Sequence, residues 1–222
     1  TGKIKIEDTE NKIIIFADKA KYLKNQEKIF TYGNSRALNN KGVTINADNF
    51  EYDKIANIFF AKKNVEIIDN KKEIEITSEN ITYFKNEEKF ETQGITKAFI
   101  ESKYEFESQN VIYYKNSQKI SSEEKSIIYD NQSNKYELDK FLFNISNKTL
   151  KGENIEVTTK NLKPKSDTFI FKSGFFDFNK RNFIADKTEI ILHKEIFDSE
   201  REAFINLENP KLNELFKEYY EE

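Results

Sequence analysis

The side chains that most often carry out catalysis are scarce in this sequence. His193, in the stretch ILHKE, is the only histidine, and there is no cysteine. Thiolate nucleophiles, thiolate metal ligands and disulfides are therefore excluded, and a lone histidine has little to work with as a metal ligand or as a base. Carboxylates are plentiful, but they alternate with lysines, and no paired acid and base stands out. We predict that the chain is not an enzyme and that it has no metal site and no cofactor.

Acidic side chains do recur at one kind of position, directly after a small residue. Asp18 follows Ala17 and Asp48 follows Ala47, and the same register later holds Glu79, Glu123, Glu153 and Asp186. Such a row of carboxylates could bind a cation, or each could accept a hydrogen bond that stabilises a corner of the backbone. We favour the hydrogen bonds over a cation site.

The small residues mark an internal repeat of about 30 residues. Four copies read IFADKAKY, INADNFEY, ITSENITY and FESQNVIY, and their small residues are Ala17, Ala47, Ser78 and Ser108. Weaker copies contain Gly152 and Ala185. The chain is also rich in charge (34%) and in aromatic residues (14%), a mixture that suits a thin structure with much surface better than a compact ball.

Each copy changes the phase of its apolar residues at the small residue. In the second copy the apolar positions before Ala47 are Val43 and Ile45, and those after it are Phe50 and Tyr52. Since side chains alternate between the two faces of a strand, such a change marks a bulge or a sharp bend. If the apolar side chains face one interior throughout, the strand must turn a corner there, and a small side chain fits the inside of that corner.

Short polar stretches connect the predicted strands. LKNQEK, FKNEEK and YKNSQK follow the tyrosines at 22, 83 and 113. Loops this short join antiparallel neighbours, because a parallel crossover needs more residues. The predicted fold class is all-β: an elongated antiparallel β-jellyroll, or folded-over taco, of about a dozen strands with an apolar interior and two open ends.

The end of the chain has a different pattern. We expect residues 1–196 to form the jellyroll domain and residues 197–222 to form a linker and a short amphipathic helix. The helix is predicted because apolar residues after Pro210 fall at helical spacing, namely Leu212, Leu215, Phe216, Tyr219 and Tyr220.

The repeat unit resembles the OstA-like repeats of the lipopolysaccharide transport family, which includes LptA, LptC and the N-terminal domain of LptD. The resemblance is carried by the pattern A-D-x-x-x-Y, its hairpin and the return segment AKKNVEI at residues 61–67. Residues 120–155, with a Ser-rich corner, a Tyr-Asp turn and a Lys-Gly corner, are most like the N-terminal periplasmic domain of LptD. Residues 192–212 resemble the segment that leads to the LptD barrel, so 197–222 could lead to a barrel that these 222 residues do not include.

The resemblance implies a non-enzymatic lipid-binding domain of the LptD N-terminal type, which conducts lipopolysaccharide across the periplasm to the outer membrane of a Gram-negative bacterium. The implied partners are lipopolysaccharide acyl chains, other jellyroll proteins of the bridge that add at edge strands, and an outer-membrane barrel with its lipoprotein. The edges are expected at KIKIE near Lys3 and at FIADKTEIIL near Ile190. With a net charge of −3 and no basic stripe, nucleic acid is a poor partner.

Two alternatives remain open. One is a free-standing LptA-like periplasmic bridge protein. The other is a structural β-repeat or adhesin-like module whose interior is filled and binds no lipid.

The residues that flank the corners are the candidates for lining a lipid groove. On one side of the corners they are Ile15, Ile45, Ile76, Phe106, Ile120, Leu150 and Phe183, and on the other side Phe50, Ile81, Val111 and Ile155. The same residues suit an ordinary hydrophobic core. The tyrosines at 22, 52, 83 and 113 lie at strand ends, where we expect each ring to cover the interior while its hydroxyl reaches water.

Overall fold

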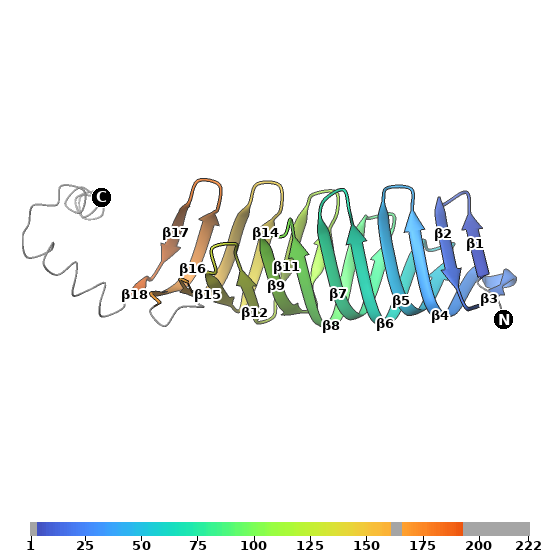
Figure 1. Cartoon of the computed structure of the whole chain (residues 1–222), viewed down its shortest axis with the longest axis horizontal. Coiled ribbons are helices and arrows are strands. Elements are labelled where there is room, and N and C mark those ends of the chain that lie inside the picture. The colour runs from blue at the N-terminus through green and yellow to red at the C-terminus, as the bar shows by residue number, and fades with distance from the viewer. Residues whose placement is uncertain (1–3, 161–165, 193–222) are drawn as a thin grey trace, which may run out of the picture.

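The chain forms a long stack of antiparallel strands in the residues that the computed structural model describes, 4–160 and 166–192 (Figure 1). Seven strands are long and continuous: β4 (Lys28–Asn39), β5 (Val43–Asp53), β6 (Ile58–Asp69), β7 (Ile74–Phe84), β8 (Lys89–Ile100), β15 (Thr149–Thr158) and β16 (Thr168–Asp177). Figure 1 shows them side by side along the long axis of the molecule.

The remaining strands are shorter, and most of them form two halves of one interrupted strand. These halves are β2 (Ile13–Ala17) and β3 (Lys19–Leu23), β9 (Tyr104–Gln109) and β10 (Ile112–Tyr114), β11 (Lys119–Ser122) and β12 (Ser126–Tyr129), β13 (Lys135–Leu138) and β14 (Lys140–Asn144), and β17 (Asn182–Asp186) and β18 (Glu189–Ile191). β1 (Ile4–Asp8) opens the stack, and a short 3-10 helix, η1 (Lys24–Gln26), follows β3. The predicted all-β jellyroll of about a dozen strands is confirmed, whereas the helix predicted within 197–222 lies outside the described residues.

The long strands are creased at their middles, as the phase change predicts. The register between paired strands shifts at Tyr32/Ser35 in β4–β5, at Asn46/Asn49 in β5–β6 and at Lys62/Val65 in β6–β7. Gly33 and Gly94 lie at creases with φ of +74° and +89°, a left-handed conformation that glycine adopts without strain. Lys63 holds the corresponding position of β6 and takes φ of 64° without being glycine. The crease is thus a property of the repeat, and glycine only eases it.

The crease divides the strands into two facing layers. The first layer contains β3, β10, β11, β14 and β17, and it ends in the first hairpin row, residues 24–27, 54–57, 85–88, 115–118, 145–148 and 178–181. The second layer contains β1, β2, β9, β12, β13 and β18, and it ends in the second hairpin row, residues 9–12, 40–42, 70–73, 101–103 and 130–134. Each long strand contributes one half to each layer. We call the side opposite the crease, where the two rows face each other, the seam.

The side chains that point between the layers form one hydrophobic core. In β5 the buried residues are Val43, Ile45 and Ala47 before the crease and Phe50 and Tyr52 after it. The change of parity therefore keeps both halves of the strand facing inward. Burial of each large side chain contributes about 1.5–3 kcal/mol, so the crease is stabilised by the core on both of its sides.

Both ends of the stack leave strands with a free edge. Within the described residues, β1 and β3 at one end and β17 and β18 at the other each pair with a single neighbour. The sequence predicts the edges at β1, β17 and β18, whereas the edge at β3 is not predicted. No helix among the described residues has the length and apolar character needed to cross a membrane.

Candidate functional site

The two layers enclose a pocket of about 290 Å³ near β17, at the C-terminal end of the described stack. Its walls are apolar and come from both layers: Tyr104, Tyr136, Val157, Phe169 and Phe171 from the second, and Phe176 and Phe183 from the first, with Phe178 in the hairpin that follows β16. The site is thus a hollow part of the interior that is otherwise filled by the core.

The crease of β16 directs the phenylalanines of this strand into the pocket. Phe169 and Phe171 precede the crease and Phe176 follows it, and the parity of the inward-facing residues changes between Phe171 and Gly174. A Cβ atom on Gly174 would lie 3.0 Å from the Phe176 ring and 3.1 Å from Ile155 Cδ1. A larger residue at 174 would therefore require the Phe176 ring or the Ile155 side chain to shift, because both pack directly against the backbone.

The aromatic rings of the pocket pack against one another, and several pairs are tilted or edge to face. The ring centroids of Phe171 and Phe183 are 5.2 Å apart, those of Phe171 and Phe176 are 5.9 Å apart, and those of Tyr136 and Phe176 are 5.6 Å apart. Tilted and edge-to-face pairs of this kind are favourable beyond the area that they bury. They form a continuous apolar wall around the hollow.

The mouth of the pocket is polar. Asp130 organises one side of it: its carboxylate accepts hydrogen bonds from the Tyr136 hydroxyl at 3.0 Å and from the Asn134 side chain at 2.9 Å. Burial, together with the charge of Asp130, raises the pKa of Tyr136, so its hydroxyl stays protonated and remains a donor. Arg181 and Asn182 lie on the other side of the mouth. Apolar walls under a polar rim suit a ligand with a hydrocarbon part and a polar part.

The structure places ten of the eleven predicted groove residues in the closed hydrophobic core. They are Ile15, Ile45, Phe50, Ile76, Ile81, Phe106, Val111, Ile120, Leu150 and Ile155. Phe183, the eleventh, is 43% exposed and lines the pocket. That all of them line a lipid path remains a prediction.

Most residues of the pocket are not among those predicted from the sequence. Phe169, Phe171, Phe176 and Phe178 were not among the candidates, although residues 169–183 contain six phenylalanines. This local density of aromatic residues was the available signal. It could have been used, because a cluster of large rings on both sides of a crease is hard to pack without a gap.

The predicted hydrogen bonds at the corners are confirmed for the first two carboxylates. Asp18 accepts a hydrogen bond from the Asn34 side chain at 2.8 Å, and Asp48 accepts one from Asn64 at 3.2 Å. Glu153 forms an ion pair of 3.0 Å with Lys140, and Glu123 lies 4.0 Å from the same lysine. The described residues contain no group of histidine and carboxylate side chains that could hold a metal ion.

The expectation that the tyrosine hydroxyls reach water is wrong for three of the four residues. Tyr52, Tyr83 and Tyr113 are buried, and only Tyr22 is exposed. The Tyr52 hydroxyl lies 3.4 Å from Asp8 and 3.3 Å from the Asn57 side chain, whereas those of Tyr83 and Tyr113 have no hydrogen-bond partner within residues 4–160 and 166–192. They are buried because the two hairpin rows meet above them.

Comparison with known proteins identifies the repeat. A solved structure with a similar chain is that of LptH, described as the LptA homologous periplasmic component of the lipopolysaccharide transport device from Pseudomonas aeruginosa; it is 17% identical, with a TM-score of 0.43, over 49% of this chain and 80% of that one. No curated protein matches. The family described as LptA/(LptD N-terminal domain) LPS transport protein matches residues 44–163, more than half of the chain. The chain therefore belongs to this family of lipopolysaccharide transport proteins.

Proposed function

We propose that this chain is a non-enzymatic, LptD N-terminal-type domain that holds lipopolysaccharide acyl chains between its two layers and conducts them through the periplasm to the outer membrane. The observation that carries the proposal is the hollow between the layers, with aromatic walls and a polar mouth. Each buried methylene contributes about 0.8 kcal/mol, so an acyl chain of about a dozen carbons gains on the order of 10 kcal/mol before ordering costs. That gain is large enough to withdraw a chain from water.

The pocket is proposed to be one station of a longer path. The path would continue along the eleven predicted lining residues, from Phe183 towards Ile15, as the core rearranges around a chain. Residues 1–196 would form the conducting domain, and residues 197–222 would lead towards a barrel in the outer membrane and its lipoprotein.

The free edges support the proposed partners. β1 and β3 at one end, and β17 and β18 at the other, leave backbone donors and acceptors for another strand. Ile184, Ile190 and Ile191 are exposed at the second end. We propose that other jellyroll proteins of the transport bridge add their edge strands at these ends and so extend the interior.

Photo-crosslinking from neighbouring phenylalanines of β16 tests the proposal. Phe176 lines the pocket, whereas Phe175 lies on the outer face and is 41% exposed. Benzoylphenylalanine at 176 is expected to label lipopolysaccharide in cells, and the same residue at 175 is expected to leave it unlabelled. Equal labelling at both positions, or none at 176, would contradict lipid conduction and favour a purely structural repeat.

A further inference from the structure

Lysine side chains bridge the seam at four successive hairpins of the first row. The lysine comes each time from this row and the acceptor from the second layer, in the pairs Lys54–Asp8, Lys85–Asn11, Lys115–Asp69 and Lys148–Glu101. Three of these lysines stand two residues after a buried tyrosine of the repeat, at 52, 83 and 113. The seam is therefore bridged at least once in each repeat along this part of the stack.

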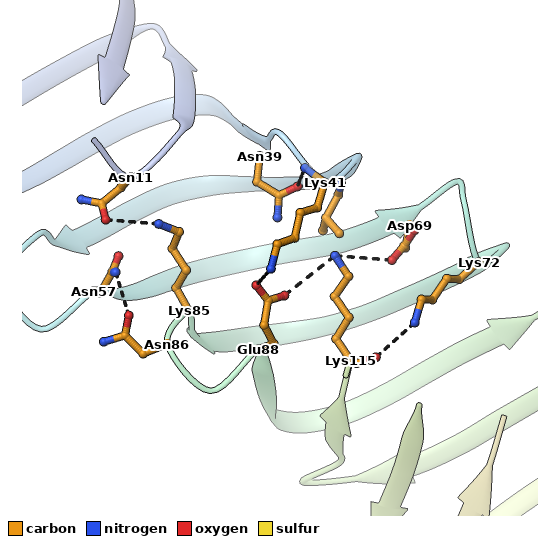
Figure 2. A network of polar contacts seen from close by, with 11 residues as sticks. Asn11, Asn39, Lys41, Asn57, Asp69, Lys72, Lys85, Asn86, Glu88 and Lys115 are labelled. Carbon is orange, nitrogen blue, oxygen red and sulfur yellow. Dashed lines mark hydrogen bonds and ion pairs between the residues drawn. The ribbon is translucent and has the colours of Figure 1, made fainter. Parts of the chain in front are cut away.

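The bridges are densest around four residues, Lys41, Asp69, Glu88 and Lys115, which we call the latch (Figure 2). Lys41, in the second hairpin row, pairs with Glu88 in the first. Lys115 Nζ lies 3.8 Å from Asp69 Oδ2 and 3.9 Å from Glu88 Oε2. Lys72 donates a hydrogen bond to the Lys115 carbonyl at 3.1 Å, also across the seam. Figure 2 shows these side chains converging from the two rows.

Three charges of the latch are buried and incompletely bonded. Asp69 is 2% exposed, and Glu88 and Lys115 are each 7% exposed. Among the described residues, Asp69 Oδ2, Glu88 Oε2 and Lys115 Nζ have no hydrogen-bond partner, because the ion pairs are longer than hydrogen bonds. A buried ion pair of this kind contributes little net stability, since the loss of hydration offsets the attraction. The closed latch is therefore held by a small margin.

The chemistry of the latch favours reversible opening. If the two rows separate, water hydrates the charges and supplies the missing hydrogen bonds. Apolar side chains in the same places would instead expose hydrocarbon and resist opening. Charged residues in a buried seam thus lower the free energy needed to separate the two rows. A seam with a purely structural role would not need this property.

The aromatic rings beneath the latch also carry buried polar groups that water would hydrate if the seam opened. Tyr83 stacks on Phe90 with ring centroids 4.1 Å apart, and Phe90 lies 5.9 Å from Tyr113. These rings fill the interior below the latch, and the hydroxyls of both tyrosines are buried and have no hydrogen-bond partner in the part of the chain that the structure describes. Both hydroxyls would gain hydrogen bonds to water if the rings moved outward when the seam opened.

The pocket lies where such bridges end. In the described residues, no ion pair or hydrogen bond joins the 178–181 hairpin to the 130–134 turn, and both segments border the pocket. The interior is thus filled where the seam is bridged by the latch and hollow where the two rows are not joined.

We infer that the latch is a gate that controls where an acyl chain can lie. While it is closed, the rings of Tyr83, Phe90 and Tyr113 fill the interior, and a chain occupies only the C-terminal pocket. When it opens, these rings move towards water and a chain lies along the interior beneath Lys41 and Glu88. This inference rests on the proposed function and concerns its regulation.

Spin-label distances across the seam measure opening without reference to lipid binding. The chain has no cysteine, so Asn40→Cys in the second row and Glu87→Cys in the first, both exposed, label cleanly. The lipid-free protein is expected to give one short distance. Addition of lipopolysaccharide is expected to add a longer one.

Two variants move the gate in opposite directions. Lys41→Glu places a second carboxylate against Glu88 and is expected to give the longer distance without lipid. The triple variant Asp69→Leu, Glu88→Leu and Lys115→Leu is expected to stay closed with lipid present, because apolar replacement of a buried ionic cluster is often neutral or stabilising. The matched control is Lys97→Leu with Glu107→Leu, an ion pair of 3.2 Å whose side chains are about half exposed.

Photo-crosslinking separates the gate from the proposed function. Benzoylphenylalanine at Phe90 reports a chain beneath the latch, and at Phe176 it reports a chain in the pocket. The triple variant is expected to lose label at 90 and keep it at 176, whereas Lys41→Glu is expected to raise label at 90, by up to about tenfold if one molecule in ten is open beforehand. The control pair should change neither position.

The outcomes that would overturn the gate are distinct from those that would overturn lipid conduction. Full labelling at 90 in the triple variant, or labelling at 90 in the unmodified chain without a longer spin-label distance, overturns the gate. If position 176 is never labelled, the proposed function fails, and the distance in lipid-free Lys41→Glu still decides: a longer distance supports the gate and an unchanged one overturns it. Because the Lys41 side chain is 54% exposed, this variant keeps the test valid if the triple variant does not fold.

Discussion

Single aspartates and asparagines at strand ends hold the hairpins of both rows. The Asp53 carboxylate accepts a hydrogen bond from the Ala56 backbone N–H at 2.8 Å, and Asp177 does the same with Lys180 at 3.0 Å. These side chains satisfy turn donors that strand pairing leaves free. They fix the hairpins, and thereby the distance between lysines of one row and acceptors of the other.

Asp53 should make stability depend on pH. The Ala56 hydrogen bond, helped by Lys28, lowers the pKa of Asp53 below its ordinary value of 3.8. A carboxylate with a lowered pKa stabilises the folded state above the unfolded-state value, and this contribution is lost as pH falls through the folded value. Asp53→Ala is therefore expected to cost about 0.5–1.5 kcal/mol at pH 7 and progressively less below pH 3.8.

Urea unfolding of both proteins from pH 7 to pH 2 measures this difference. Asp53→Asn is the control, because its amide oxygen can still accept the Ala56 hydrogen bond while the charge is gone. A cost for Asp53→Ala that does not change with pH would show that the ionised carboxylate contributes nothing.

For single residues, the sequence predicts which side chains point inward, but it does not predict where they leave a gap. Alternation placed Ile45 and Phe50 inside, and both are buried. The hollow near Phe176 depends on how far apart the two layers lie. Alternation along a strand contains no information on that distance.

The long strands are creased, and a substitution at Lys63 tests how much strain a non-glycine residue causes at the crease. A non-glycine residue in the left-handed conformation destabilises the folded state by about 1–2 kcal/mol. Glycine lowers stability by about 0.4–1 kcal/mol because it raises the entropy of the unfolded chain, which is the smaller effect. Lys63→Gly is therefore expected to raise the free energy of unfolding by up to about 1 kcal/mol, since Lys63 has φ of 64°. Denaturant unfolding measures it.

Lys62→Gly is the matched control for this prediction. Lys62 is the adjacent residue in the same strand and is not among the left-handed residues. Glycine there is expected to lower stability by about 0.5–1 kcal/mol. If both substitutions destabilise alike, the left-handed backbone at 63 carries no strain that glycine could relieve.

The creases were predictable because the small residue and the phase change occur in every copy of the repeat. The bridges across the seam were not predictable in the same way. Lys54, Lys85 and Lys115 recur in register, but their acceptors differ because partners are set by the stagger between two layers. Lys115 reaches Asp69, whereas Lys85 reaches Asn11. The periodicity of the sequence determines the arrangement of residues within each layer. It does not determine which residues of the two layers lie opposite each other.

The whole molecule is a stack in which each strand half pairs only with its neighbours. β6 pairs with β5 and β7 over nearly its full length. β18 pairs with β16 through three residues, and the side chains of β18 are exposed. In such a quasi-one-dimensional fold, local opening is expected to be easiest at the ends.

Hydrogen exchange should therefore fall from the ends of the stack towards its middle. Peptides that cover β17 and β18 (182–191) are expected to exchange at least tenfold faster than those that cover β6 (58–69), because about 1.4 kcal/mol of local stability corresponds to a factor of ten. The longer pairing and complete burial of the β6 core provide more than this difference. Mass spectrometry of peptides resolves the two regions, and β7 (74–84) is the internal control for the middle. Equal exchange across all three regions would mean that the stack opens only as one unit. The free edge at β17 and β18 would then be as rigid as the core. A partner strand that pairs with this edge would not order it further.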